Sequence, residues 1–296
     1  MPEPPPYSYS QNFSKSRAIE LAALIDAAYQ QLTDFQNNNA WNVPGPRTVT
    51  PQKNQVDPVD PVPGPKQYQI EAQFSAVETW GLPTVVPKPR IPFGFVATAG
   101  NDVYVAIRGT QTPLEWLDDA TVGFEPFVPN TAAPGQAWGN TTKGFSGLYI
   151  QIITDIIAGL KNIQAAGNPL NSLFVTGHSL GAALAHLVAA GIKASLNVDP
   201  VSYTFSGPRT GDPAFAQAFI DQGLQTWRIV NTEDIVPIVP ISSNQLGNTS
   251  PTSIFLNVLI HGLPAGFSHI GYPVSVTFDQ GRVDDNHNLD NLWATL

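Results

Sequence analysis

The chain contains no cysteine and has few charged residues. Because none of its 296 residues is a cysteine, disulfide bonds, thiol nucleophiles and zinc–thiolate sites are excluded. The lack of cysteine does not identify a compartment, since a disulfide-free protein folds in either redox environment. Charged residues make up 12% of the sequence, about half the usual share, while hydrophobic residues make up an ordinary 42%. This composition predicts a folded globular protein rather than a disordered one.

Positive charge is especially scarce. The 14 lysines and arginines are outnumbered by 23 aspartates and glutamates, which gives a net charge of −9. The basic residues also form no run anywhere in the sequence. This balance argues against a nucleic-acid partner and against attachment to an acidic membrane surface.

Long hydrophobic runs are missing as well. The apolar stretches, such as residues 253–260, are far too short to span a bilayer, so no transmembrane segment is predicted. Residues 1–6 carry neither a positive n-region nor an apolar h-region, so no secretory signal is visible in the printed sequence. We leave the localisation open.

The order of apolar patterns indicates an α/β architecture. An amphipathic helix is predicted over residues 15–36, followed by a Pro-rich strap over residues 41–65. Further along, strand patterns alternate with helical patterns: strands at 68–74, 93–98, 102–108, 173–176, 201–206 and 225–230, and helices at 145–163, 182–195 and 213–222. Such alternation predicts a mostly parallel central sheet with helices on both faces. With no internal repeat and no composition break, we expect a single domain over residues 1–296.

A candidate nucleophile lies at the first strand-to-helix turn of the second half. Residues 177–181 read Gly-His-Ser-Leu-Gly and match G-x-S-x-G, with an apolar strand before them and an Ala-rich helix after them. In such a turn the Ser179 hydroxyl projects from the sheet edge, above a helix N-terminus that stabilises negative charge. The alternative is an ordinary glycine-bracketed turn. The side chain of His178 is expected to point away from Ser179 in a structural or pocket-lining role.

A catalytic serine needs a histidine to take its proton and a carboxylate to orient that histidine. In this type of fold the chain order is serine, acid, histidine. Asp234 follows the strand at 226–230 and precedes Ile-Val-Pro, which makes it the favoured acid. Its neighbour Glu233 is the main competitor, and a solvated turn carboxylate is the alternative. Asp199 precedes its strand, and Asp212 is explained as a helix N-cap before proline.

Three histidines follow the candidate acid. His287 lies in a polar loop, residues 284–290, beyond the last predicted strand, where a base could hang over the nucleophile. His269 opens a strand-like run and could be a buried structural histidine, and His261 lies in an apolar loop. The acidic residues around His287 could instead form a cation loop, but they lack the ligand spacing and central glycine of an EF-hand. We therefore favour His287 as the base and predict no metal.

Taken together, these motifs resemble the class 3 lipase family, typified by fungal triacylglycerol lipases. An ordered set of motifs is more specific than any single one. The matching segments are residues 106–110 (Ala-Ile-Arg-Gly-Thr), 143–145 (Lys-Gly-Phe), 175–182 (Val-Thr-Gly-His-Ser-Leu-Gly-Ala), 205–211 (Phe-Ser-Gly-Pro-Arg-Thr-Gly), 231–237 (Asn-Thr-Glu-Asp-Ile-Val-Pro) and 285–287 (Asp-Asn-His). The resemblance implies an α/β-hydrolase fold with Ser179 as nucleophile, Asp234 as acid and His287 as base.

The resemblance also implies that Thr110 supplies one oxyanion-hole donor. The backbone N–H of Leu180, the residue after the nucleophile, supplies the second, as the strand–turn–helix geometry requires. Thr110 could alternatively be a plain turn residue at a strand end. No metal or organic cofactor is implied. The fungal members are secreted and disulfide-linked, so their localisation does not carry over to a chain without cysteine.

A short amphipathic helix is predicted where the resembling family has its lid. Residues 112–115 fit a capping box, and Leu114, Trp116 and Leu117 are apolar among acidic neighbours. Such a helix could cover the site in water and expose its apolar face at a lipid surface. The alternative is a fixed surface helix with Trp116 packed inward. Apolar residues in the ranges 122–127 and 254–267 could line an acyl groove or fill the core.

The sequence therefore predicts a serine carboxylic-ester hydrolase of lipase type that cleaves fatty-acyl glycerol esters through an acyl-enzyme on Ser179. Its expected partners are a lipid or other ester substrate and, transiently, a lipid interface. A phospholipase A1-like or feruloyl-esterase-like substrate is the alternative on the same fold. A non-catalytic ligand-binding protein is a more remote reading, and a peptidase is disfavoured because nothing suggests a charged specificity pocket.

Overall fold

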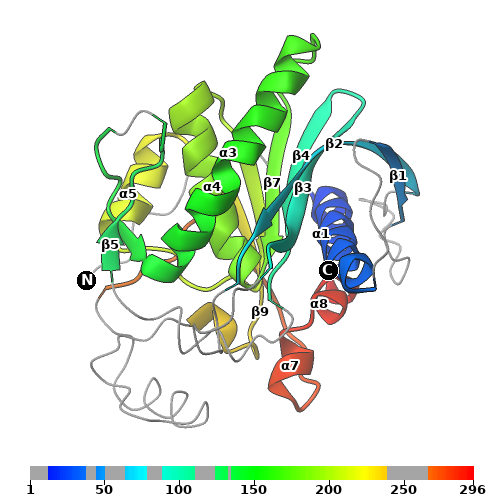
Figure 1. Cartoon of the computed structure of the whole chain (residues 1–296). Coiled ribbons are helices and arrows are strands. Elements are labelled where there is room, and N and C mark those ends of the chain that lie inside the picture. The colour runs from blue at the N-terminus through cyan, green and yellow to red at the C-terminus, as the bar shows by residue number, and fades with distance from the viewer. Residues whose placement is uncertain are drawn as a thin grey trace.

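The computed structural model describes residues 13–37, 45–50, 64–78, 89–110, 124–132, 135–238 and 266–296. Its main sheet has eight strands (Figure 1). In spatial order they are β1 (Gly45–Val49), β2 (Lys66–Ala76), β3 (Ile91–Ala99), β4 (Asp102–Ile107), β7 (Leu173–His178), β8 (Val201–Phe205), β9 (Gln225–Asn231) and β10 (Tyr272–Val276). Strands β1 to β4 pair antiparallel, and β4, β7, β8, β9 and β10 run parallel. A small second sheet pairs β5 (Phe124–Pro126) with β6 (Asn140–Thr142).

Helices cover both faces of the main sheet, as the alternating pattern predicts. Helix α1 (Lys15–Gln36) and the C-terminal α8 (Leu289–Thr295) pack on one face, and Figure 1 shows them on the same side of the strands. Helices α3 (Lys143–Ala165), α4 (Leu180–Leu196) and α5 (Pro213–Asp221) pack on the other. The short elements η1 (Val236–Ile238) and α7 (Val283–Asn286) lie in the connections after β9 and β10.

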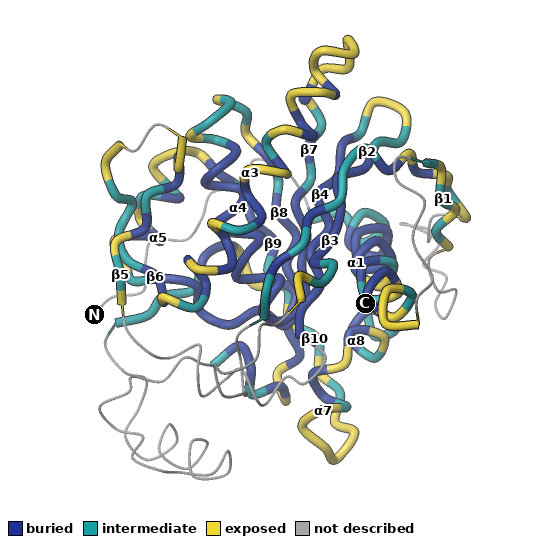
Figure 2. The backbone as a smooth tube through the Cα atoms, in the orientation of Figure 1, coloured by how far each residue is buried: buried dark blue, intermediate teal, exposed yellow. Residues whose placement is uncertain are grey.

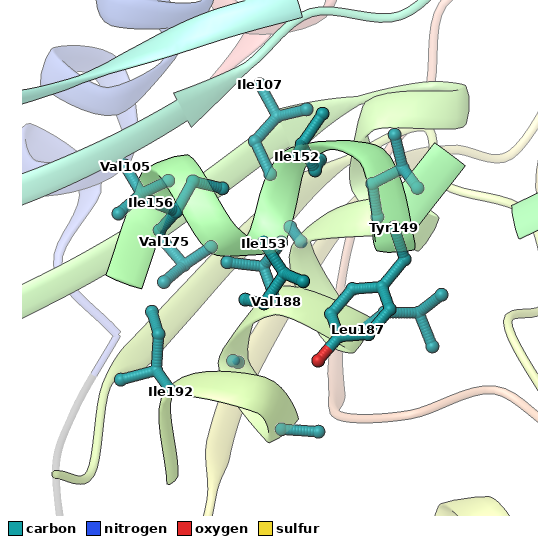
Figure 3. Close-up of a cluster of buried hydrophobic side chains, with 14 of the residues drawn as sticks. Val105, Ile107, Tyr149, Ile152, Ile153, Ile156, Val175, Leu187, Val188 and Ile192 are labelled. Atoms are coloured by element: carbon teal, nitrogen blue, oxygen red, sulfur yellow. The ribbon is translucent and has the colours of Figure 1, made fainter. Parts of the chain in front are cut away.

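The central parallel strands β4 and β7 are buried on both sides, which explains why they read as largely apolar runs. In β4, Val105 and Ile107 face α3 and α4, whereas Tyr104 and Ala106 face α1. Figure 3 shows Val105 and Ile107 among the side chains of α3, and Figure 2 shows the buried strands between outer helices that are partly exposed. The sheet therefore separates two apolar layers.

Two sequence expectations are corrected. The predicted strap contains a strand, β1, which pairs along the edge of the sheet with β2; an edge position tolerates Pro46, which has no N–H to donate. The other strap residues, except 50 and 64–65, lie outside the described residues. The predicted polar loop at 284–290 is instead α7 followed by the start of α8, because the side chain of Asn288 accepts the N–H groups of Asp290 and Asn291 and caps α8.

Within the described residues, no helix combines the length and apolar character needed to cross a membrane.

Helix α1 is fixed to the sheet by the buried carboxylate of Glu20. Glu20 Oε1 accepts hydrogen bonds from Lys66 Nζ at 2.8 Å, from the Tyr68 hydroxyl at 2.8 Å and from the Tyr104 hydroxyl at 2.9 Å. Glu20 Oε2 accepts one from Arg17 Nη1 at 2.6 Å. Burial and then the Glu20 charge raise the pKa of both tyrosines. The cluster thus joins α1 to β2 and β4 through one carboxylate.

Removing this carboxylate is expected to cost about 2 kcal/mol of unfolding free energy, because Glu20→Ala leaves the buried Tyr68 hydroxyl without its acceptor. The partly exposed Arg17 and Lys66 keep Asp102 as a partner. The exposed Asp199, which pairs with Lys193 at 2.5 Å, is the control, and Asp199→Ala should cost less than about 1 kcal/mol. Urea unfolding monitored by circular dichroism measures both values. Equal losses for the two variants would contradict this role of Glu20.

Candidate active site

Ser179 occupies a strained position between β7 and α4. Its φ of 57° and ψ of −126° lie in a region that non-glycine residues rarely adopt. Glycines make the turn possible: a Cβ at Gly177 would lie 2.1 Å from the Gly181 carbonyl oxygen, and one at Gly181 would lie 2.5 Å from the Ile107 and Arg108 carbonyl oxygens. Although Ser179 is the N-cap of α4, its hydroxyl makes no capping bond. The side chain therefore stands clear of the helix backbone.

The acid and the base predicted from the sequence form a buried pair. His287 Nδ1 lies 2.8 Å from Asp234 Oδ2, and the two side chains are 1% and 0% exposed. Asp234 Oδ1 accepts the Val236 N–H at 2.9 Å. Because a carboxylate oxygen accepts here, Nδ1 carries a proton. In the neutral imidazole, Nε2 then presents a lone pair. Neither His287 Nε2 nor the Ser179 hydroxyl has a hydrogen-bond partner among the described residues.

The predicted base, His287, lies against the turn that carries Ser179. The rings of His287 and of His178, the residue before Ser179, have centroids 4.7 Å apart. Asp234 follows β9 and Ser179 follows β7, so both leave the sheet at the C-terminal ends of parallel strands. Residues far apart in the sequence thus meet at one sheet edge, the place where open α/β sheets bind ligands.

The turn after β4, residues 108–110, packs directly on Ser179. A Cβ at Gly109 would lie 3.0 Å from Ser179 Cβ. Thr110 is buried, and within the described part of the chain its hydroxyl has no partner. Arg108 fixes the turn by donating to the Pro92 carbonyl at 2.6 Å and to Glu78 Oε1 at 3.1 Å. The N–H groups of Arg108 and Gly109 are bonded to Phe93 and Tyr29, so Thr110 is the residue of this turn whose N–H could serve as a donor near Ser179. Leu180, directly after Ser179, begins α4.

Asn231 joins the acid-bearing and base-bearing loops, and sequence reasoning missed it. Its Nδ2 donates to the carbonyls of Phe278 and Asn286, each at 3.0 Å. Its Oδ1 accepts the N–H of Phe278 at 3.1 Å and that of Glu233 at 3.3 Å. Asn286 and Glu233 precede His287 and Asp234, so one buried amide holds both loops. The sequence signals for it were its place at the end of the strand before Asp234 and its position as the first residue of the matching segment 231–237.

The competing candidates lie elsewhere or lack the contact. Glu233 is exposed, whereas Asp234 is buried against His287. His269 hydrogen-bonds to the backbone of Pro237, and burial lowers its pKa well below the usual range. These contacts fit the structural alternative for His269. His261 lies outside the described residues.

The predicted lid residues Leu114, Trp116 and Leu117 also lie outside the described residues. Of the residues expected to line an acyl groove, Phe127 is part of the core at 2% exposure, because it packs against Tyr149 and Phe215. The described residues contain no group of three or more His, Asp or Glu side chains that could hold a metal ion.

Replacing Asn231 should loosen both loops. Asn231→Asp keeps the shape of the side chain but places a charged oxygen against two carbonyls, so we expect a loss of about 2 kcal/mol in unfolding free energy. Thr232→Val, which removes an exposed hydroxyl contact to Thr277, is the matched control and should keep the wild-type stability. Denaturant titration measures both values. An Asn231→Asp variant with wild-type stability would contradict the role given to this amide.

The middle of this chain matches a known protein family. Residues 104–244 match the family model described as Lipase (class 3). Phospholipase A(1) DAD1, chloroplastic, from Arabidopsis thaliana is 37% identical over 151 residues, covering 47% of this chain and 34% of that protein. The secreted mono- and diacylglycerol lipase A of Penicillium cyclopium is 34% identical over 161 residues, covering 53% and 50% respectively. This chain therefore spans about a third to a half of the length of these curated relatives.

A solved structure shares the fold. The crystal structure of the lipase from Rhizopus microsporus var. chinensis superposes with a TM-score of 0.56 at 21% identity, over 93% of this chain and 81% of that one. The likeness confirms the predicted α/β-hydrolase fold. Residues 104–244, which include the strands around the Ser179 turn, are therefore similar in sequence to the class 3 lipase family.

Proposed function

We propose that this protein is a serine carboxylic-ester hydrolase of lipase type. The observation that carries the proposal is the buried His287–Asp234 pair, which lies against the strained turn that presents Ser179. A nucleophile, a base and an orienting carboxylate are the three groups that acyl transfer through a serine requires. The class 3 lipase match is independent support.

The proposed reaction needs only residues of this chain and water. His287 Nε2 takes the proton from the Ser179 hydroxyl while Ser179 Oγ forms a bond to the ester carbonyl carbon. The backbone N–H groups of Thr110 and Leu180 donate to the oxyanion that develops. When the tetrahedral intermediate collapses, the bond between the carbonyl carbon and the alkoxy oxygen breaks, and the alcohol leaves with the proton from His287. Water then gives a proton to His287 and attacks the acyl-enzyme. The bond from the acyl carbon to Ser179 Oγ breaks, the proton returns to Ser179, and the acid is released.

Fatty-acyl glycerol esters are the proposed substrates. The printed names of the relatives include mono- and diacylglycerol lipases and phospholipases A1, so a phospholipase A1-like activity is the alternative, with feruloyl esters as a further one. Apolar chain burial contributes about 0.8 kcal/mol per methylene group, which favours long acyl chains in an apolar groove. Transient contact with a lipid interface is part of this proposal, because an exposed aromatic side chain could insert into such a surface. Phe124 is 47% exposed, and its ring stacks on that of Phe267 with the centroids 4.5 Å apart.

A series of p-nitrophenyl esters of increasing chain length should be hydrolysed faster as the acyl chain grows. Parallel assays with triacylglycerol, diacylglycerol, phosphatidylcholine and feruloyl ester substrates separate the alternatives. A preference for short aromatic acyl groups would contradict the lipase assignment.

A fluorophosphonate probe should label the wild-type protein on one residue, and Ser179→Ala should abolish the labelling, because the probe reacts only with an activated serine. Intact-mass spectrometry and peptide mapping measure the adduct. An unlabelled, folded wild-type protein would instead favour a non-catalytic ligand-binding role.

Asp234→Asn should lower kcat by a factor on the order of 10⁴, since the amide no longer holds His287 in the required tautomer. The neighbouring exposed carboxylate is the matched control, and Glu233→Gln should stay near the wild-type rate. Initial rates of ester hydrolysis compare the two. A similar fall in kcat in both variants would contradict the proposal that Asp234, and not Glu233, orients His287.

A further inference from the structure

A hydrogen-bond chain, half-buried at Tyr29 and buried at His178, connects helix α1 to the candidate catalytic residues. The Gly109 N–H donates to the Tyr29 hydroxyl oxygen at 3.0 Å. That hydroxyl lies 2.9 Å from His178 Nδ1, and His178 Nε2 lies 2.9 Å from the His287 carbonyl oxygen. We name these contacts the Tyr29–His178 chain. It touches the turn before Thr110, the residue before Ser179, and the backbone of the base.

The donor and the acceptor of each hydrogen bond follow from the chemistry of the two partner atoms. A backbone carbonyl only accepts, so His178 Nε2 must carry the proton that it shares with His287. In a neutral imidazole Nδ1 is then an acceptor, and the Tyr29 hydroxyl donates to it. The hydroxyl oxygen is left to accept the Gly109 N–H. Every donor in the chain therefore has one acceptor, and only one tautomer of His178 satisfies all three contacts.

Close packing leaves this arrangement little room to change. A Cβ at Gly109 would lie 2.5 Å from the Tyr29 hydroxyl oxygen and 2.7 Å from the His178 carbonyl oxygen. Burial and then the nearby His287 hold the pKa of His178 well below its usual range, and burial raises the pKa of Tyr29. Both groups therefore stay neutral, as the bond directions require.

We propose that Tyr29 is a positioning residue of the active site, which acts through His178 to hold the base His287 and through Gly109 to hold the oxyanion turn. This inference rests on the proposed hydrolase function. It extends the site to α1, an element that sequence reasoning treated as a helix packed on the domain. Tyr29 touches neither the nucleophile nor the acid, so its effect must pass through backbone placement.

Loss of the hydroxyl should affect rate more than folding. Tyr29→Phe keeps the ring but leaves the Gly109 N–H without its acceptor and His178 Nδ1 without its donor. A displacement of about 1 Å in a catalytic group can cost about 100-fold in rate. We expect Tyr29→Phe to lower kcat and the fluorophosphonate labelling rate by roughly 10- to 100-fold, with KM nearly unchanged.

Tyr149→Phe is the matched control. Its hydroxyl is also buried and donates to a backbone carbonyl, that of Pro129, in a part of α3 that plays no role in the proposed site. Both variants should lower the thermal midpoint by similar amounts, but only Tyr29→Phe should lose rate. Equal rates in the two variants would overturn the inference while leaving the proposed function intact.

His178, the second residue of the Tyr29–His178 chain, gives an independent test. His178→Gln can still donate to the His287 carbonyl, because the glutamine amide nitrogen replaces Nε2, whereas His178→Leu cannot. The glutamine variant should therefore keep at least tenfold more activity than the leucine variant. The double variant Tyr29→Phe/His178→Gln should be no slower than the slower single variant, because the two residues act in one chain.

Two outcomes separate the claims. If wild-type protein is labelled by the probe and the Tyr29 and His178 losses multiply in the double variant, the chain does not act as one unit and the inference fails alone. If folded wild-type protein is not labelled, the proposed function and this inference fail together. Nitrogen-15 NMR of His178 adds a readout that does not use activity: Nε2 should be protonated and Nδ1 unprotonated between about pH 5 and pH 8.

Discussion

The left-handed backbone of Ser179 is the constraint around which the rest of the site is arranged. A residue with a side chain adopts such a conformation at a cost of about 1–3 kcal/mol, so the surrounding structure must over-determine it. Here β7 enters the turn in register with β4 and β8, and α4 leaves it with an Ala-rich buried stretch. The glycines at 177 and 181 are the positions where a Cβ would collide with backbone. The strain is thus held by the most deeply buried part of the molecule.

The remaining groups reach this turn by two connections. Near Asp234 and His287, the Asn231 amide joins the loop after β9 to the loop after β10. Near residues 108–110, Tyr29 and His178 join α1, the turn after β4 and the backbone of His287. Both connections use backbone carbonyls and N–H groups as their ends. Such contacts fix where a loop lies without depending on the identity of the residue that it carries.

The sequence predicted the parts of this arrangement that are local. The strand–turn–helix pattern around Ser179, the N-cap at Asp212 and the position of Asp234 after its strand all follow from neighbours in the chain, and the structure has each of them. The β1 strand was missed because its pairing with β2 depends on a partner about twenty residues away. Tyr29 and Asn231 were missed for the same physical reason, because each meets its partners only after the layers have packed. Tyr29 lies 149 residues from His178 in the sequence, and Asn231 lies 55 residues from Asn286.

A crystal structure of the protein with a phosphonate bound to Ser179 would test the proposed chemistry, because the phosphonyl oxygen occupies the place of the oxyanion. The account expects that oxygen to lie about 2.7–3.1 Å from the backbone nitrogens of Thr110 and Leu180, with the His287 ring still bonded to Asp234. An adduct on another side chain, or a phosphonyl oxygen directed away from both nitrogens, would contradict it.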